Sequence, residues 1–203
     1  MFWYEEDIKQ LENKISRLQD KKHIAFYGSS TFRLWTNLEK EFDLINGTNL
    51  GFGGSTLAAC VWYFDRIFTK LNPSCFIIYA GDNDIGDNRH PEEVFIFFLQ
   101  LLDKIRNRFG NIPIFYISIK PSISRYHIID RIEYTNKIIS QEINTLANNT
   151  FYINLYDKML DESGFPIKDY YLHDGLHLSP KGYELWKKII TQYLNEYLPS
   201  ESV

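Results

Sequence analysis

The loop 171–180 carries a residue pair that could do proton-transfer chemistry: Asp174 lies three residues before His177. Gly175 inside the loop and Pro180 just after it argue against a helix here. In a turn, an aspartate at this spacing can accept a hydrogen bond from the imidazole Nδ1–H, which leaves Nε2 free to take a proton from a nucleophile. Taken alone, the loop is more simply a surface histidine near a helix start, so the chemistry depends on partners elsewhere in the chain.

A candidate nucleophile lies early in the chain, where the apolar run 23–28 ends in Gly28 and is followed by Ser29, Ser30 and Thr31. A glycine followed by small hydroxyl residues at a strand-to-helix turn can present a side chain above the edge of a sheet. Such a turn also leaves backbone N–H groups free at the start of the helix. Taken alone, Ser-Ser-Thr after a glycine is more often simply a helix N-cap.

A glycine-rich turn follows the second apolar run and contains Gly51, Gly53 and Gly54. Glycines let the backbone approach a ligand closely. A dinucleotide-binding fingerprint is disfavoured, because Thr56 stands where the third glycine is needed and because the turn follows the second run, not the first. A glycine that donates its N–H to an oxyanion is the alternative.

The acidic turn 80–87 follows the third apolar run and resembles a calcium loop at first sight. Gly86 stands at the fifth position of that loop instead of the sixth, and a strand precedes it instead of a helix, so calcium is disfavoured. Asn83 could instead offer its side-chain NH₂ to a developing negative charge. His173 and His177 would suit a metal on a helix but not in the expected loop, and we expect no metal.

The elements that must position these segments alternate regularly. Segments of helical period separate apolar runs of strand length; the runs cover 23–28, 43–48, 74–81, 112–119 and 150–155, and the helical segments 55–70, 91–109, 124–147 and 179–197. Runs that are apolar on both faces suit a parallel sheet with helices on both sides. The alternation predicts an α/β fold, a three-layer sandwich, in which ligands sit beyond the carboxyl ends of the strands.

The opening of the chain predicts an amphipathic helix over about 4–20, with Ile8, Leu11, Ile15 and Leu18 on one face. The run is too short for three heptads, so we expect this helix to pack on the rest of the chain and not to form a dimerisation coil. A length of 203 residues predicts one domain over 1–203. The oligomeric state stays open.

The composition argues against nucleic acid and membranes as binding partners. The net charge of -4 and the pI of about 5.7 provide no basic field for nucleic acid. No stretch is long and apolar enough for a transmembrane helix, and the N-terminus lacks the pattern of a secretory signal, so we expect a cytoplasmic protein without stable membrane association. Cys60 and Cys75 fall in apolar segments and are expected to be buried thiols in a reducing compartment.

In order and spacing, the four polar segments resemble the motif blocks of the SGNH (GDSL-type) hydrolases over nearly the full length of the chain. The resemblance implies the flavodoxin-like three-layer α/β/α sandwich around a five-stranded parallel sheet, and an esterase that needs no cofactor. It implies Ser30 as nucleophile, with Asp174 and His177 completing the triad. It also implies an oxyanion hole made by the Ser30 and Gly54 amides and the Asn83 side chain.

One position departs from the family pattern, because Ser29 stands where an aspartate usually precedes the nucleophile. That aspartate is not a triad member, so its replacement does not exclude activity. It does place two adjacent serines near the site, and the register with Gly28 favours Ser30.

We therefore expect a serine esterase or acylhydrolase that cleaves a carboxylic ester through an acyl-enzyme on Ser30. Its partner would be a small-molecule ester with a small acyl or O-acetyl group, carried by a carbohydrate or a lipid. The alternatives are an acyltransferase with the same triad and a non-catalytic carbohydrate- or ligand-binding domain of the same fold. Four residues near the motifs could line a pocket or belong to the core or surface: Arg33, Trp35, Phe52 and Trp62.

Overall fold

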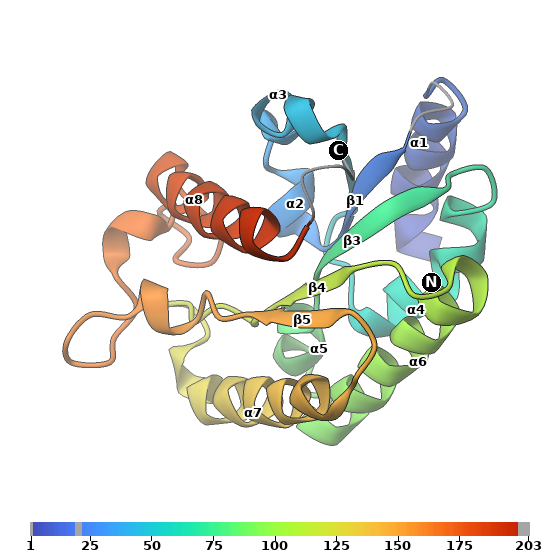
Figure 1. Cartoon of the computed structure of the whole chain (residues 1–203). Coiled ribbons are helices and arrows are strands. Elements are labelled where there is room, and N and C mark those ends of the chain that lie inside the picture. The colour runs from blue at the N-terminus through green and yellow to red at the C-terminus, as the bar shows by residue number, and fades with distance from the viewer. Residues whose placement is uncertain (1, 19–21, 199–203) are drawn as a thin grey trace.

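A computed structural model describes residues 2–18 and 22–198 of the chain (Figure 1). Its centre is a parallel sheet of five strands in the order β2-β1-β3-β4-β5. The strands are β1 (His23–Gly28), β2 (Gly47–Gly51), β3 (Pro73–Tyr79), β4 (Ile114–Ile117) and β5 (Thr150–Ile153). This confirms the predicted α/β fold, and the strand order is the flavodoxin-like one.

Helices cover both faces of the sheet (Figure 1). One face carries α1 (Glu5–Ile15), α4 (Leu57–Ile67), α6 (Pro91–Phe109) and α7 (Ile129–Thr145). The other carries α2 (Ser30–Arg33), α3 (Leu38–Glu41) and α8 (Pro180–Tyr197). The short helix α5 (Asp82–Gly86) follows β3, and 3₁₀ turns cover Phe2–Tyr4, Asp43–Ile45, Tyr126–Ile128, Asp157–Met159 and Lys168–Tyr170.

The strands are mostly buried, β1 and β4 along their whole length, because each face of the sheet has its own apolar core. In β1, Ala25 and Tyr27 point into the core under α4 and α6, whereas Ile24 and Phe26 point into the core under α3 and α8. This is why the strands read as continuous apolar runs instead of alternating ones.

The two cysteines are free and belong to different cores, Cys60 on the α4 side of the sheet and Cys75 on the α8 side. Burial raises the pKa of both thiols. They are buried, as expected from the sequence, and the sheet lies between them.

Several predicted boundaries are wrong. The second strand was expected over 43–48 but covers Gly47–Gly51, because 43–45 form a 3₁₀ turn that ends at Asn46 in the left-handed conformation. The helix expected from 55 starts only after Thr56, whose side chain accepts from the Ala59 amide and caps the first turn.

Most of the other boundaries that differ move inward, where strand and helix ends give way to turns. The strand expected over 74–81 covers Pro73–Tyr79, and the one over 112–119 covers only Ile114–Ile117. The strand over 150–155 ends at Ile153, and the helix over 124–147 spans Ile129–Thr145.

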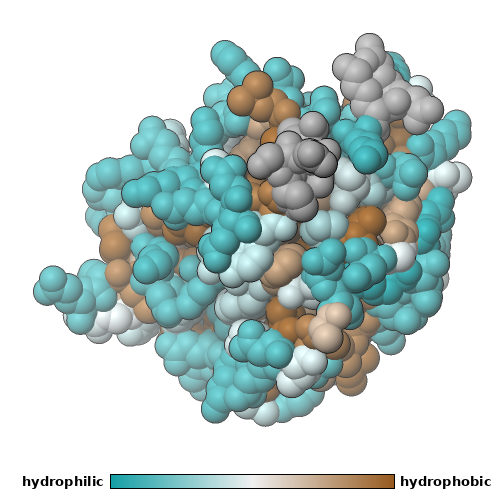
Figure 2. All heavy atoms as spheres, in the orientation of Figure 1, coloured by the Kyte–Doolittle hydropathy of each residue, from teal (hydrophilic) through white to brown (hydrophobic). Residues whose placement is uncertain are grey.

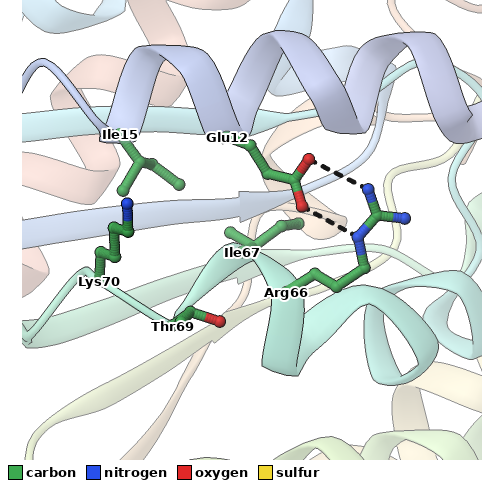
Figure 3. Close-up of a pocket in the computed structure, with 6 residues that line it drawn as sticks. All are labelled: Glu12, Ile15, Arg66, Ile67, Thr69 and Lys70. Carbon is green, nitrogen blue, oxygen red and sulfur yellow. Dashed lines mark hydrogen bonds and ion pairs between the residues drawn. The ribbon is translucent and has the colours of Figure 1, made fainter.

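The N-terminal helix is shorter than the predicted 4–20, since α1 ends at Ile15, and residues 19 and 20 lie outside the described part of the chain. Its apolar face, Ile8, Leu11 and Ile15, is buried in the same core as α4. Figure 3 shows Arg66 of α4 reaching across to Glu12 of α1.

The visible face of the molecule is mostly hydrophilic, with apolar residues scattered among polar ones (Figure 2). Among residues 2–18 and 22–198, no helix has the length and apolar character needed to span a bilayer.

Candidate active site

The turn after β1 directs Ser30 outward and Ser29 inward. Gly28 has a φ of +148°, and a Cβ there would lie 1.9 Å from the Tyr79 carbonyl oxygen, so only glycine fits. The Ser29 amide donates to that same oxygen over 2.9 Å. Ser29 is 2% exposed and is the N-cap residue of α2, while Ser30 is the first residue of that helix and is partly exposed.

The Asp174–His177 turn is held by its own hydrogen bonds. Asp174 Oδ1 accepts from the amides of Leu176 (2.9 Å) and His177 (3.0 Å), and Oδ2 lies 2.6 Å from His177 Nδ1. Partial burial acts to raise the pKa of Asp174, but the bonds from the His177 ring and the two amides outweigh it and lower the pKa to about 2. The carboxylate can therefore only accept, so Nδ1 is the donor of this pair, and in the neutral imidazole Nε2 is the nitrogen that can accept.

The other ring nitrogen faces the nucleophile turn, because Ser30 Oγ lies 3.4 Å from His177 Nε2. The structure thus brings Ser30, His177 and Asp174 into one chain of contacts, although Ser30 and His177 are 147 positions apart. The distance is at the long end of the range for a hydrogen bond.

Helix α8 holds the histidine loop against the nucleophile turn. Ser179 is its N-cap, as predicted, with Pro180 in the first turn, and the Ser179 hydroxyl accepts from the Gly182 amide over 3.2 Å. One turn further on, the Tyr183 hydroxyl donates to the carbonyl of Thr31 over 2.9 Å. The start of α8 is therefore tied directly to α2.

The glycine-rich turn and the asparagine also converge on the nucleophile turn. The carbonyl of Gly28 accepts both the Phe52 amide (3.0 Å) and the Ser55 hydroxyl (2.9 Å). The Asn83 side-chain NH₂ donates to the carbonyl of Ser55 over 3.1 Å. The carboxyl ends of β1, β2 and β3 are thus joined by hydrogen bonds.

Two amides in this region, those of Ser30 and Gly54, have no acceptor among the residues that the structure describes. Gly54 has a φ of +65°, and a Cβ there would meet nothing within 4 Å, so its turn is open on that side. Within the described ranges 2–18 and 22–198, no group accepts a hydrogen bond from the backbone N–H of Ser30 or of Gly54. Both groups can therefore donate to a bound molecule.

A buried ion cluster that the sequence reasoning missed surrounds Asn83. Arg125 donates from Nη2 to Asn83 Oδ1 over 3.0 Å and from Nη1 to the carboxylate of Asp82, which Lys120 also reaches over 2.9 Å. Burial acts to raise the pKa of Asp82, but the two cations outweigh it and the pKa is lowered. The only signal for this cluster was a basic, proline-containing segment after the fourth strand.

Asp84 connects the acidic turn with α4. Its Oδ2 accepts from the Leu57 amide over 2.7 Å, while Oδ1 has no hydrogen-bond partner in the described part of the chain. Burial raises the pKa of Asp84 to about 6, against the opposing effects of the Leu57 amide and of Arg89, whose Nη1 lies 3.7 Å from Oδ1. Asp82 and Asp84, the two buried carboxylates of this turn, thus make internal contacts.

The structure also places the residues considered for metals and for a pocket. The described residues contain no group of three or more His, Cys, Asp or Glu side chains that could hold a metal, and His173 is exposed. Trp35 and Phe52 are core residues, 2% and 0% exposed, so the idea that they line a pocket is wrong.

The other two residues considered for a pocket lie on the surface. The Arg33 side chain is 51% exposed and Trp62 is 70% exposed. Neither contacts Ser30 or His177 by hydrogen bond or ring packing in the described structure.

Fold and site together are those of a hydrolase with a serine, a histidine and an aspartate at the carboxyl edge of a flavodoxin-like sheet. The chain matches the GDSL-like lipase/acylhydrolase family over residues 5–185, and it belongs to that family. This confirms the resemblance found in the sequence. No curated protein sequence gives a significant match.

Solved structures of other proteins share the fold. A proposed acylhydrolase from Bacteroides fragilis is 21% identical, with a TM-score of 0.82 over 94% of this chain and 97% of that chain. A GDSL-like lipase from Bacteroides thetaiotaomicron is 22% identical, with a TM-score of 0.79 over 94% and 98% of the two chains. A family 3 carbohydrate esterase from Clostridium thermocellum is 18% identical, with a TM-score of 0.71 over 90% and 99%.

Proposed function

We propose that the chain is a serine esterase that cleaves a carboxylic ester through an acyl-enzyme on Ser30. The observation that carries the proposal is the line of contacts from Ser30 Oγ to His177 Nε2 (3.4 Å) and from His177 Nδ1 to Asp174 (2.6 Å). Membership of the GDSL-like lipase/acylhydrolase family supports it. No other hydroxyl group lies within hydrogen-bond distance of His177 Nε2 in the described residues, and Ser29 is buried.

In the first half of the reaction, Ser30 Oγ attacks the ester carbonyl carbon while His177 Nε2 takes the hydroxyl proton. Asp174 stabilises the imidazolium that forms, and its lowered pKa keeps it ionised throughout. Collapse of the tetrahedral intermediate breaks the bond to the alcohol, which leaves with the proton from Nε2. In the second half, water attacks the carbonyl carbon of the acyl-enzyme while Nε2 takes one of its protons. The bond to Ser30 Oγ then breaks, Oγ takes that proton back from Nε2, and the acid leaves.

The negative charge on the carbonyl oxygen would be stabilised by three donors: the amides of Ser30 and Gly54 and the side chain of Asn83. In the part of the chain that the structure describes, nothing accepts a hydrogen bond from either amide. Asn83 has two N–H groups, so it can keep its bond to the Ser55 carbonyl and still donate to the substrate. Loss of one such donor typically lowers turnover by about 10²–10³.

For the substrate we propose a small acyl group, such as acetyl, carried by a hydrophilic alcohol such as a carbohydrate. Polar and charged groups surround the site, among them Arg125 and Asn83. Structural neighbours include a carbohydrate esterase and an acetyl esterase solved with an acetate ion, which share the fold.

The test compares the native chain with Ser30→Ala and Ser29→Ala on p-nitrophenyl acetate, longer p-nitrophenyl esters and acetylated sugars. We expect Ser30→Ala to abolish turnover and labelling by a serine-directed phosphonate, and Ser29→Ala to retain both. Turnover should fall as the acyl chain lengthens. Activity in Ser30→Ala but not in Ser29→Ala would assign the nucleophile to Ser29. A native chain that neither turns over esters nor is labelled would refute the proposal.

A further inference from the structure

Two residues near the N-terminus, Tyr4 and Asp7, form hydrogen bonds with the turn that carries Gly54. The Tyr4 hydroxyl donates to the Gly54 carbonyl oxygen over 3.0 Å, and Asp7 Oδ2 accepts from the Gly53 amide over 2.7 Å. Both contacts join residues about fifty positions apart, so neither is a consequence of local chain folding.

These contacts bracket one peptide group. The Gly53 amide belongs to the peptide between residues 52 and 53, and the Gly54 carbonyl to the peptide between 54 and 55. The peptide between them carries the Gly54 N–H, which is the proposed oxyanion donor. With its two neighbours held, and with Gly54 in the left-handed region, this peptide has little freedom to rotate.

We propose that Tyr4 and Asp7 are positioning residues that fix the direction of the Gly54 N–H for catalysis. The inference rests on the proposed esterase function and adds a part of the chain outside the four motif segments. It assigns α1 and the turn before it a role in the reaction, beyond covering the core.

The Tyr4 hydroxyl is directed to Gly54 by the packing of its ring. Tyr4 is 5% exposed, and its ring meets those of Phe52 and Tyr63 edge to face, with centroids 5.5 Å and 6.1 Å away. Phe52 is the first residue of the turn that contains Gly54, so the ring and the hydroxyl of Tyr4 both contact this turn.

Asp7 is held in a similar way from the other side. Its side chain is 22% exposed, and the Nε of Arg33 lies 3.6 Å from the Oδ2 that accepts the Gly53 amide. Arg33 is the last residue of α2, so this contact joins α1, the glycine-rich turn and the helix that begins at Ser30.

The segment that carries both residues is itself firmly anchored. Arg66 of α4 donates two hydrogen bonds to the carboxylate of Glu5 and two to the carboxylate of Glu12, which lies further along α1 (Figure 3 shows the pair with Glu12). At the end of the helix, Lys14 donates to the Asn49 carbonyl over 2.6 Å. These contacts hold α1 in place, and with it Asp7 and the preceding Tyr4, whose side chains hydrogen-bond to the turn.

A misdirected donor would weaken binding of the transition state more than binding of the substrate, because full charge on the oxygen develops only in the transition state. Tyr4→Phe removes the hydroxyl and keeps the ring. Asp7→Ala removes the acceptor, whereas Asp7→Asn keeps an oxygen that can accept from Gly53. Glu6→Ala is the matched control, since Glu6 is an exposed neighbour on the same helix.

The experiment measures kcat and KM for p-nitrophenyl acetate, the Kd of a small boronic acid that forms a tetrahedral adduct with the serine, and the thermal unfolding midpoint. We expect Tyr4→Phe and Asp7→Ala to lower kcat between about tenfold and a hundredfold with KM nearly unchanged. The boronic acid should bind more weakly by the same factor. Asp7→Asn should recover most of the loss, and Glu6→Ala should match the native chain.

The outcomes separate the two proposals. If Tyr4→Phe and Asp7→Ala keep the native kcat, or if only KM rises, the positioning role is refuted and the esterase proposal is unaffected. A loss in Asp7→Asn as large as in Asp7→Ala would also contradict it, because the accepting oxygen is retained. Absence of ester turnover and of serine labelling in the native chain would overturn both proposals.

Discussion

Arg125 donates to Asn83 Oδ1 over 3.0 Å, and this single contact decides which edge of the asparagine amide faces the site. With Oδ1 engaged by a cation, the NH₂ group is left to point toward Ser55 and the nucleophile turn. The guanidinium of Arg125 also donates to the carboxylate of Asp82. That carboxylate accepts a second hydrogen bond from Lys120. The asparagine is therefore oriented by a buried ion cluster.

Arg125→Met should lower kcat by about tenfold or more, because the amide loses the bond that orients its donor. Stability should fall as well, since Asp82 keeps only Lys120 as a partner. Arg125→Lys preserves a positive charge for Asp82 but has no second nitrogen for Asn83, so it should restore stability more than kcat. Ester kinetics together with urea unfolding check this, and native kcat in Arg125→Met would contradict it.

Asp174→Asn should lower kcat by about 10³–10⁴ while KM changes little. An asparagine amide can donate to Nδ1, which favours the tautomer with the proton on Nε2, and that nitrogen then cannot accept the Ser30 proton. Asp169→Asn is a matched control, since Asp169 is an exposed partner of Lys181. Steady-state kinetics at neutral pH measure both variants, and a loss smaller than about tenfold in Asp174→Asn would refute this role.

Asp84 should make the protein less stable as the pH rises from about 4 to about 6. Burial raises the pKa of Asp84 from 3.8 to about 6, so in this window the folded chain holds a proton that the unfolded chain has released. The contribution to the free energy of unfolding is fully present below about pH 4 and is lost as the pH rises through about 6, a total change of about 3 kcal/mol.

Asp84→Asn has no such proton to lose and can still accept from the Leu57 amide. The stability of the native chain relative to this variant should therefore be greater at pH 4 than at pH 7. Urea unfolding at both values measures the difference. If the difference between the two proteins does not change with pH, the carboxyl group does not titrate in this range.

Gly28→Ala should prevent stable folding or lower the free energy of unfolding by more than about 4 kcal/mol. The added Cβ would lie 1.9 Å from the Tyr79 carbonyl oxygen, and relieving that overlap requires moving β1 away from β3. Gly110→Ala is the control, because Gly110 also has a positive φ of +69° but has nothing within 4 Å of its Cβ position. Denaturant unfolding should show a smaller penalty there, about 1–3 kcal/mol from the backbone conformation alone, and equal penalties at the two positions would contradict the steric argument.

The pattern of the fold was accessible from the sequence because its signals are local. Continuous apolar runs indicated buried parallel strands, and Ser179-Pro180 indicated the start of α8, as the structure has it. The second strand was misplaced because Leu44 and Ile45 resemble strand residues, whereas Leu44 is 92% exposed in a 3₁₀ turn. Apolar character alone does not distinguish a short run that is buried from one that is not.

The Asp174–His177 turn is the part of the candidate site that the sequence determined by itself. Its hydrogen bonds join residues at most three positions apart, so the order Asp-x-x-His contains all its partners. The tertiary structure decided the rest of the site. Ser30 contacts His177 from 147 positions away in the sequence. Arg125 hydrogen-bonds to Asn83 from 42 positions away, and Tyr4 to Gly54 from 50 positions away. Such contacts depend on the order of strands in the sheet and on where α1 and α8 pack, and no spacing of residue types along the chain specifies them.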